Sequence, residues 1–264
     1  MNRVDGRIAL VSGAGGGIGA ATCAALLAGG ARVVATDRFD APSAHLAPVT
    51  AAAGDRCLYL RADVTVGGDW QRAVDTAVAR FGGLDILVNN AGLYRTARIE
   101  EVTDEQIDLL FGVNLKGVVL GTRHAIGAMK KRPAGADSAS IINLSSIAGL
   151  VGASLASVYS LTKGGVRLFT KSTALEVAML GYNIRCNSVH PGIVDTDMGA
   201  QVAETLEARG MTTGQARAAM AANHPIGRLA QPGDIARAIV FLASNDSSFM
   251  TGSEVVVDGG WTAR

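Results

Sequence analysis

Short apolar runs recur along the chain, and segments of helix length separate them. Seven runs have the length and side-chain pattern of β-strands: residues 8–11, 32–36, 57–61, 84–88, 140–144, 184–189 and 254–257. Strands that alternate with helices predict a parallel sheet with helices on both faces. Because no repeat, low-complexity segment or linker interrupts the pattern, we predict an α/β fold. It has one doubly wound, seven-stranded parallel sheet in a single domain, residues 1–264.

Helix starts can also be identified from the sequence. Thr103-Asp104-Glu105-Gln106 has the form of a capping box and predicts a helix that runs to about Lys131. A proline in the first turn marks a late helix over residues 232–242, and residues 158–180 form a third helical pattern. Residues 195–225 fall outside the alternation of strands and helices. A loop of this length is typical of a lid over a substrate site.

The charge balance excludes several classes of partner. The chain has 264 residues, a formal net charge of +1 and no cluster of more than three basic residues. This composition argues against nucleic acid and against an anionic membrane surface. No apolar run reaches the length of a membrane span, and residues 1–7 are too short and mixed for the start of a signal peptide. The expected partner is therefore a small molecule.

The cysteines and histidines lack the pattern of a metal site. The three cysteines lie far apart in apolar surroundings, which favours reduced thiols in a cytoplasmic protein. The four histidines show no metal-ligand spacing, so we predict no metal.

A glycine cluster follows the first predicted strand. The stretch SGAGGGIG, residues 12–19, contains five glycines in eight positions and precedes a helical pattern over residues 20–27. Bare backbone at a strand-to-helix turn lets a pyrophosphate approach the unpaired N–H groups of the first helical turn. A plain turn also uses glycine, so the loop alone leaves both interpretations open.

An acidic residue at the end of the second strand favours dinucleotide binding. Asp37 lies eighteen residues after Gly19, close to the ~20-residue offset of the acid that binds a ribose 2′-hydroxyl. A carboxylate at that place would repel a 2′-phosphate, so we predict NAD rather than NADP. Arg38 keeps NADP open as the alternative, because an arginine there could pair with the phosphate.

A tyrosine and a lysine share one face of the predicted helix over residues 158–180. Tyr159 and Lys163 are four positions apart, and a nearby ammonium lowers the pKa of a phenol, as does the charge of an oxidised nicotinamide. Ser145 and Ser146 end the fifth strand, at the same sheet edge as the glycine loop. The four side chains predict acid/base chemistry there.

With these motifs the chain resembles the short-chain dehydrogenases/reductases over nearly its whole length. The resemblance rests on the glycine loop with Gly13, Gly17, Ile18 and Gly19, and on Asn89-Asn90-Ala91-Gly92, Asn114, Ser146, Tyr159, Lys163, and Pro191-Gly192 followed by Thr196. Ser12 departs from the family's usual threonine but keeps the hydroxyl. The family's spacing of thirteen residues before the tyrosine selects Ser146, which leaves Ser145 as structural.

The resemblance implies a Rossmann fold, a role for each site residue and a homotetramer. It implies that Asp63 and Val64 hold the adenine, Asn90 and Gly92 line the ribose, and Ile193 and Thr196 orient the carboxamide. It also implies that Asn114 holds a water that links Lys163 to solvent. Tyr159 and Lys163 would contact the cofactor as well. Ser146 would hydrogen-bond the substrate oxygen while Tyr159 takes the hydroxyl proton and hydride passes to the nicotinamide.

Three functions remain under comparison. The first is an NAD-dependent dehydrogenase of secondary alcohols, and the second is a 3-oxoacyl-thioester reductase. Lys130-Lys131-Arg132 fits an acidic carrier protein, whereas Leu175 and the absence of a basic residue in the glycine loop argue against it. The third is a cofactor-sensing regulator without catalysis, which the complete set of Ser146, Tyr159 and Lys163 disfavours.

The segments around the site predict an apolar substrate. Residues 147–158 carry no charge, and Leu93-Tyr94 follows the asparagine motif. Five apolar side chains come from the predicted lid: Met198, Val202, Leu206, Met211 and Met220. We predict a neutral secondary alcohol or ketone, with cyclic alcohols and hydroxysteroids ahead of sugars and hydroxy acids. Arg95 would bind an anion only if it turned inward.

Overall fold

A parallel sheet of seven strands forms the centre of the protein. The structure is a computed structural model that describes residues 4–208 and 210–263, so residues 1–3 and 264 of the predicted domain and residue 209 of the predicted lid lie outside the description. The strands are β1 (Ile8–Ser12), β2 (Arg32–Asp37), β3 (Cys57–Arg61), β4 (Ile86–Asn89), β5 (Ala139–Leu144), β6 (Ile184–Pro191) and β7 (Glu254–Val257). Their order is β3-β2-β1-β4-β5-β6-β7, and every neighbouring pair is parallel. The predicted fold class and single domain are confirmed.

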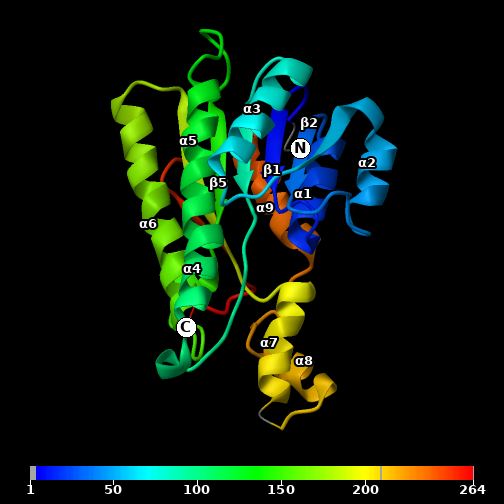
Figure 1. The fold of residues 1–264 in the computed structure, drawn as a ribbon, viewed down its shortest axis with the longest axis vertical. Coiled ribbons are helices and arrows are strands. Elements are labelled where there is room, and N and C mark those ends of the chain that lie inside the picture. Colours follow the sequence, from blue (N-terminus) through cyan, green and yellow to red (C-terminus); the bar gives the residue numbers. More distant parts are fainter. Residues whose placement is uncertain (1–3, 209, 264) are drawn as a thin grey trace.

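Helices cover both faces of this sheet (Figure 1). The described helices are α1 (Gly17–Ala28), α2 (Ala47–Ala53), α3 (Gly67–Phe81), α4 (Asp104–Phe111), α5 (Gly117–Met129), α6 (Ser157–Met179), α7 (Asp197–Glu207), α8 (Thr213–Ala222) and α9 (Pro232–Ala243). Side chains of α1 and α9 pack on one face, and those of α3, α5 and α6 pack on the other. The order of the strands reverses between β1 and β4, which is where α/β sheets of this type bind ligands.

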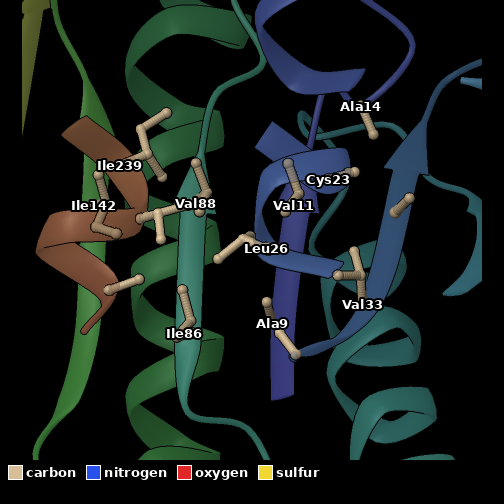
Figure 2. Close-up of a cluster of buried hydrophobic side chains, with 14 of the residues drawn as sticks. Ala9, Val11, Ala14, Cys23, Leu26, Val33, Ile86, Val88, Ile142 and Ile239 are labelled. Carbon is tan, nitrogen blue, oxygen red and sulfur yellow. The ribbon is translucent and has the colours of Figure 1, made fainter. Parts of the chain in front are cut away.

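Alternate residues of β1 face the two layers. Ala9 and Val11 pack with Leu26 of α1 and with the layer that includes Ile239 of α9, whereas Leu10 belongs to the opposite core (Figure 2). Every residue of β1 is buried, so this strand reads as a continuous apolar run, as a strand covered on both faces should. The two layers hold the carboxyl ends of β1 and β4 rigidly side by side.

Several strands extend beyond their predicted ends into polar residues. Ser12, Asp37 and Asn89 each complete a strand, and Pro191 ends β6. The fourth strand begins at Ile86 rather than at residue 84. The ladder hydrogen bonds continue past the apolar run, so the first polar residues at the carboxyl edge are held in strand geometry.

The helix predicted over residues 103–131 is interrupted. A π-helical turn, Gly112–Lys116, lies between α4 and α5, and α5 ends at Met129. Thr103 caps α4 as predicted, because its side chain accepts the N–H of Gln106. The π turn contains Asn114, whose contacts are described below.

The segment predicted as a loop over residues 195–225 is mostly helical, so that prediction is wrong. Thr196 caps α7 by accepting the N–H of Gly199 at 3.3 Å, and Thr212 forms a capping box with Gln215 at the start of α8. Asp195 and Arg217 form an ion pair at 3.0 Å that ties α8 to the end of β6. Figure 1 shows α7 and α8, in yellow and orange, standing at one end of the molecule.

The described residues contain neither a membrane-spanning helix nor a metal-binding cluster. In residues 4–208 and 210–263, no helix is both long and apolar enough to cross a membrane. Over the same residues, no three side chains of histidine, cysteine, aspartate or glutamate gather as a metal site would require. The absence of a metal stays a prediction.

Candidate active site

The glycine loop brings bare backbone to the start of α1. Gly13 leaves β1 with a φ of +63°, and a Cβ at Gly19 would collide with the carbonyl oxygen of Gly13. The first hydrogen bond of the helix runs from the N–H of Ala20 to the oxygen of Gly16, at 2.8 Å. The N–H groups of Gly17 and Ile18 therefore precede the helical ladder at the positive end of its dipole. They form a cradle suited to a phosphate.

Asp37 fastens this loop to the end of β2. One carboxylate oxygen accepts the N–H of Gly15 at 2.9 Å, and the other accepts the N–H of Arg38 at 2.8 Å. The guanidinium of Arg38 lies over the ring of Phe39, 5.0 Å from its centroid. Asp37 thus presents a negative charge beside the phosphate cradle. The positive charge of the neighbouring Arg38 lies over the ring of Phe39.

Ser12 and Asn90 join the carboxyl ends of β1 and β4. The Oγ of Ser12 accepts the N–H groups of Asn90 and Ala91, each at 3.2 Å. The Nδ2 of Asn90 donates to the carbonyl oxygens of Ser12 and Gly13 at 3.0 and 2.9 Å. The serine that replaces the usual threonine therefore keeps the loop in place.

Asp63 and Val64 follow β3 near the same edge. The Oδ1 of Asp63 accepts the N–H and the hydroxyl of Thr65, both at 2.8 Å. The carbonyl oxygen of Val64 accepts the indole N–H of Trp70 at 3.0 Å. These bonds fix the turn, and both residues line the cavity described below.

Tyr159, Lys163 and Ser146 meet where β5 ends against α6. Tyr159 and Lys163 are buried, and the Nζ of Lys163 lies 5.7 Å from the centroid of the Tyr159 ring. The Nζ also donates to the carbonyl oxygen of Leu144 at 2.8 Å. The side chain of Ser146 hydrogen-bonds Tyr159. Ser145 donates instead to the carbonyl oxygen of Lys163 at 2.8 Å, a structural contact.

Burial dominates the electrostatics of this group. It raises the pKa of Tyr159 to about 12, against the lowering effect of the hydrogen bond with Ser146. It also lowers the pKa of Lys163 to about 8. The predicted lowering of the phenol pKa is therefore not a property of the chain alone, because desolvation of the buried phenol has the largest effect on it. It would require a further positive charge beside the phenol.

Asn114 lies behind the catalytic group in the π turn. Its Oδ1 accepts the N–H of Leu93 at 2.8 Å, and its Nδ2 donates to the oxygen of Leu93 at 2.9 Å and to Oγ1 of Thr162 at 3.1 Å. A Cβ at Gly92 would lie 3.4 Å from the Nζ of Lys163 and 3.5 Å from the Oδ1 of Asn114. Asn114 therefore connects the segment after β4 with α6, next to Lys163.

The backbone of Ile193 is already paired within the protein. Its N–H donates to the Nε2 of His224 at 3.1 Å, and its oxygen accepts the N–H of Ala230 at 3.0 Å. Because both backbone groups of Ile193 are bonded, the N–H of Val194 is the candidate hydrogen-bond donor to a ligand in this segment. Val194 also lines the cavity. The Oγ1 of Thr196 donates to the oxygen of Val194 at 3.3 Å. No motif or spacing marked His224 as a contact of this segment.

One cavity of about 780 Å³ brings the predicted site residues together. Of these residues only Asn114 is absent from its lining, because Asn114 is fully buried behind Gly92. The rest line the cavity: Gly13, Gly17, Ile18, Gly19, Asp37, Asp63, Val64, Asn90, Gly92, Ser146, Tyr159, Lys163, Ile193 and Thr196.

The part of the cavity beyond Tyr159 is largely apolar. Tyr94 lines it and contacts the Tyr159 ring edge-on, with 5.0 Å between centroids. Arg95 is exposed, and its Nη1 donates to the oxygen of Tyr94 at 2.7 Å, so it does not turn inward. Of the predicted lid side chains, three line this part: Met198, Val202 and Leu206.

Two methionines of the predicted lid are absent from the cavity lining. Met220 is buried among Ala203, Ala216 and Leu229, and Met211 is 40% exposed. Trp261, which sequence reasoning missed, lines the cavity instead. The only signal for it was a large aromatic residue in a glycine-rich turn.

A family model described as enoyl-(acyl carrier protein) reductase matches residues 13–262. The chain belongs to the short-chain dehydrogenase/reductase family. The resemblance found in its motifs is thereby confirmed.

Three curated short-chain dehydrogenases/reductases are similar over almost their whole length. Cyclopentanol dehydrogenase of Comamonas sp. (strain NCIMB 9872) is 39% identical over 264 residues, 100% of both chains. The 3-alpha-(or 20-beta)-hydroxysteroid dehydrogenase of Mycobacterium tuberculosis (strain ATCC 25618 / H37Rv) is 42% identical over 261 residues, 99% of this chain and 91% of the relative. The NADP-dependent (R)-specific alcohol dehydrogenase of Lentilactobacillus kefiri is 37% identical over 263 residues, 100% and 99% of the two chains. The protein is therefore an oxidoreductase of a short-chain dehydrogenase/reductase family that uses a nicotinamide dinucleotide.

Proposed function

We propose that the protein is an NAD-dependent dehydrogenase that interconverts a neutral, largely apolar secondary alcohol, cyclic or of the hydroxysteroid type, and its ketone. One observation carries the proposal. The Ser146, Tyr159 and Lys163 group opens on a cavity that is also lined by Tyr94, by uncharged residues of 147–154, and by Met198, Val202 and Leu206 of α7. The charged residue that α7 adds to this lining, Asp197, is an acid and would repel an anion. An anionic substrate would lack a partner against these residues, and an unpaired buried charge is strongly unfavourable. Relatives that are named for cyclopentanol and for hydroxysteroids support the same substrate class.

The residues present fit a nicotinamide dinucleotide. The space beside Gly17 and Gly19 exists because no Cβ fills it: at Gly17 a Cβ would lie 2.7 Å from the Cγ2 of Thr196. Gly13, Gly17, Ile18 and Gly19 would hold the pyrophosphate, while Asp63 and Val64 would hold the adenine. Asn90, Gly92, Tyr159 and Lys163 would face the nicotinamide ribose. Ile193, Thr196 and the N–H of Val194 would orient the carboxamide. When bound, the group accepts or returns the hydride.

Asp37 supports NAD over NADP. Its carboxylate lies at the end of β2 beside the cradle and would accept a ribose hydroxyl, whereas a 2′-phosphate there would meet like charge. Arg38 is stacked on Phe39 in this arrangement. An NADP-dependent relative exists, so the preference needs a direct test.

Each catalytic side chain has a defined task. Ser146 would hold the substrate oxygen, and Tyr159 would exchange a proton with it through its hydroxyl. A phenol whose pKa is about 12 is protonated at neutral pH, so Tyr159 starts as a proton donor for ketone reduction. For alcohol oxidation it must act as a base, which the charge of Lys163 favours. Asn114 would hold a water that links Lys163 to solvent.

The helices α7 and α8 would cover the substrate.

An exposed apolar face of α6 supports assembly into an oligomer. Leu161, Leu168 and Leu175 repeat every seven residues along α6 and are 59%, 65% and 75% exposed. We infer that this stripe packs against a second copy within a homotetramer, which the mass in light scattering would test.

All three cysteines are unpaired, which supports a reducing, cytoplasmic location.

The thioester reductase remains the second candidate, since the matching family model is described as an enoyl-(acyl carrier protein) reductase. Its proposed docking cluster is partly used within the fold. The Nε of Arg132 pairs with Asp85 at 2.7 Å, and Lys130 lies over the ring of Tyr182. A cofactor-sensing regulator without catalysis is disfavoured by the intact catalytic group.

A screen with both cofactors tests the proposal. Initial rates with NAD and with NADP would be measured for cyclohexanol, a hydroxysteroid, a sugar and a 3-hydroxyacyl thioester. We expect the highest kcat/KM for a ring alcohol with NAD. A clear preference for the sugar or the thioester would overturn the substrate class, and no turnover of any alcohol would favour the regulator.

A further inference from the structure

Residues 258–262 form a tight turn that contains Trp261, a residue of the cavity lining. The carboxylate of Asp258 accepts the N–H of Gly260 at 2.9 Å and the N–H and hydroxyl of Thr262 at 2.8 and 2.7 Å. Gly259 and Gly260 have φ values of +59° and +88°, which suit glycine. The N–H of Trp261 donates back to the oxygen of Asp258 at 3.2 Å. The turn therefore holds Trp261 in a defined position.

A buried histidine holds the indole from one side. The rings of His224 and Trp261 meet edge to face, with centroids 4.9 Å apart and an interplanar angle of 72°. His224 is 2% exposed, accepts the N–H of Ile193 through Nε2, and donates through Nδ1 to the oxygen of Met220 at 2.9 Å. These two bonds fix the imidazole, so the indole packs against a rigid surface rather than a mobile one.

The same contacts connect the indole to the nicotinamide side of the site. Ile193 follows Pro191-Gly192 in the chain, and His224 lies against Gly192, where a Cβ would be 2.8 Å from Nε2. His224 therefore contacts both Trp261 and Ile193, which belongs to the segment that would orient the carboxamide. The lining of the same cavity includes Met198, Val202 and Leu206 of α7, which are apolar side chains.

We propose that Trp261 is a specificity-determining residue, whose indole forms a flat wall against which the carbon ring of the substrate packs. The proposal rests on the proposed dehydrogenase function and deepens it. A rigid aromatic plane buries more apolar surface of a ring than of a short open chain. The residue therefore favours cyclic over open-chain secondary alcohols.

The first test compares a ring with an open chain. The kcat/KM values of cyclohexanol and 2-butanol would be measured for wild type, Trp261→Ala and Trp261→Phe. We expect Trp261→Ala to lower the ratio of the two values about tenfold, mainly through the KM of cyclohexanol, and Trp261→Phe to keep most of it. Phe249→Ala, which removes a fully exposed aromatic ring, serves as the matched control and should leave the ratio unchanged.

The second test observes the indole without turnover. The tertiary alcohol 1-methylcyclohexanol has no hydrogen on its carbinol carbon, so it binds but cannot be oxidised; 2-methyl-2-butanol is its open-chain counterpart. The chain has two tryptophans, so the emission change of wild type with NAD minus that of Trp261→Phe reports Trp261. We expect a blue shift with the ring alcohol that is larger than the shift with the open-chain alcohol.

The outcomes distinguish a failure of the role proposed for Trp261 from a failure of the proposed dehydrogenase function. An unchanged ratio in Trp261→Ala, or equal emission changes with both tertiary alcohols, overturns the role of Trp261 and leaves the dehydrogenase function standing. A wild type that oxidises neither secondary alcohol with NAD or NADP overturns the proposed function itself. If Trp261→Ala does not fold, Trp261→Phe and the emission measurement decide.

Discussion

Replacing Asp37 by asparagine isolates the charge that is proposed to select NAD. The substitution keeps the size of the side chain and one oxygen acceptor, so the N–H of Gly15, now bonded at 2.9 Å, can still be satisfied. The N–H of Arg38, now bonded at 2.8 Å, loses its acceptor, but this bond is exposed and water can replace it. The loop should therefore retain its shape, at a cost of about 1 kcal/mol.

The expected magnitude follows from Coulomb's law. Asp37 is half-buried and lines the cavity, so an effective dielectric constant of ~40 is appropriate between the surface and bulk values. One unit of 2′-phosphate charge about 5 Å from the carboxylate then costs about 1.7 kcal/mol, which is ~16-fold in preference. Asp37→Asn should shift the ratio of kcat/KM for NAD over NADP by at least that factor toward NADP.

The assay measures the absorbance of the reduced nicotinamide for one alcohol with each cofactor. Asp40→Asn is the matched control, because its carboxylate is 91% exposed, pairs with Arg61 at 3.5 Å and does not line the cavity. A wild type that prefers NADP, or an Asp37→Asn ratio within about threefold of wild type, would refute the reasoning.

The remaining predictions concern the catalytic group and the support of the sheet. Tyr159→Phe should lower kcat by ~10²–10⁴-fold with NAD binding retained in calorimetry, and near-normal turnover would remove the proposed acid/base role. Lys163→Met removes a charge that lies 5.7 Å from the centroid of the Tyr159 ring and is worth ~3 kcal/mol at an effective dielectric constant of ~20. The rise of oxidation kcat/KM with pH should therefore move to higher pH, and an unmoved profile contradicts this. Arg185 is buried and donates to the oxygens of Leu242 and Ser244 at 3.0 and 3.1 Å, so Arg185→Met should cost about 3 kcal/mol and lower Tm by ~6–12 °C. Arg98→Met, at an exposed position, should leave Tm nearly unchanged, and equal effects would count against the buried network.

The strands and the cofactor loop could be predicted because local sequence determines them. An apolar run between polar segments is enough to mark β1, and a glycine cluster after it is enough to mark the turn. The capping box of α8, formed by Thr212 and Gln215, is equally local, and it marks a helix within the segment that is predicted as a loop.

Other features depend on residues that are distant in the chain. The π turn lies where Asn114 bonds both backbone groups of Leu93, and no pattern near Asn114 announces a partner after another strand. The pairing of Ile193 with His224 and the place of Trp261 are likewise products of the folded chain. The pKa of Tyr159 depends on burial, which the spacing to Lys163 does not report.

The position of β1 between β2 and β4 has a consequence for synthesis on the ribosome. β2 follows β1 closely, but β4 emerges only after β3 and α3 have been made. Until then, the edge of β1 that will pair with Ile86–Asn89 has open N–H and C=O groups in an apolar strand. We expect nascent chains that stop before β4 to associate through this edge and to engage chaperones, and chains that include β4 to be released from them.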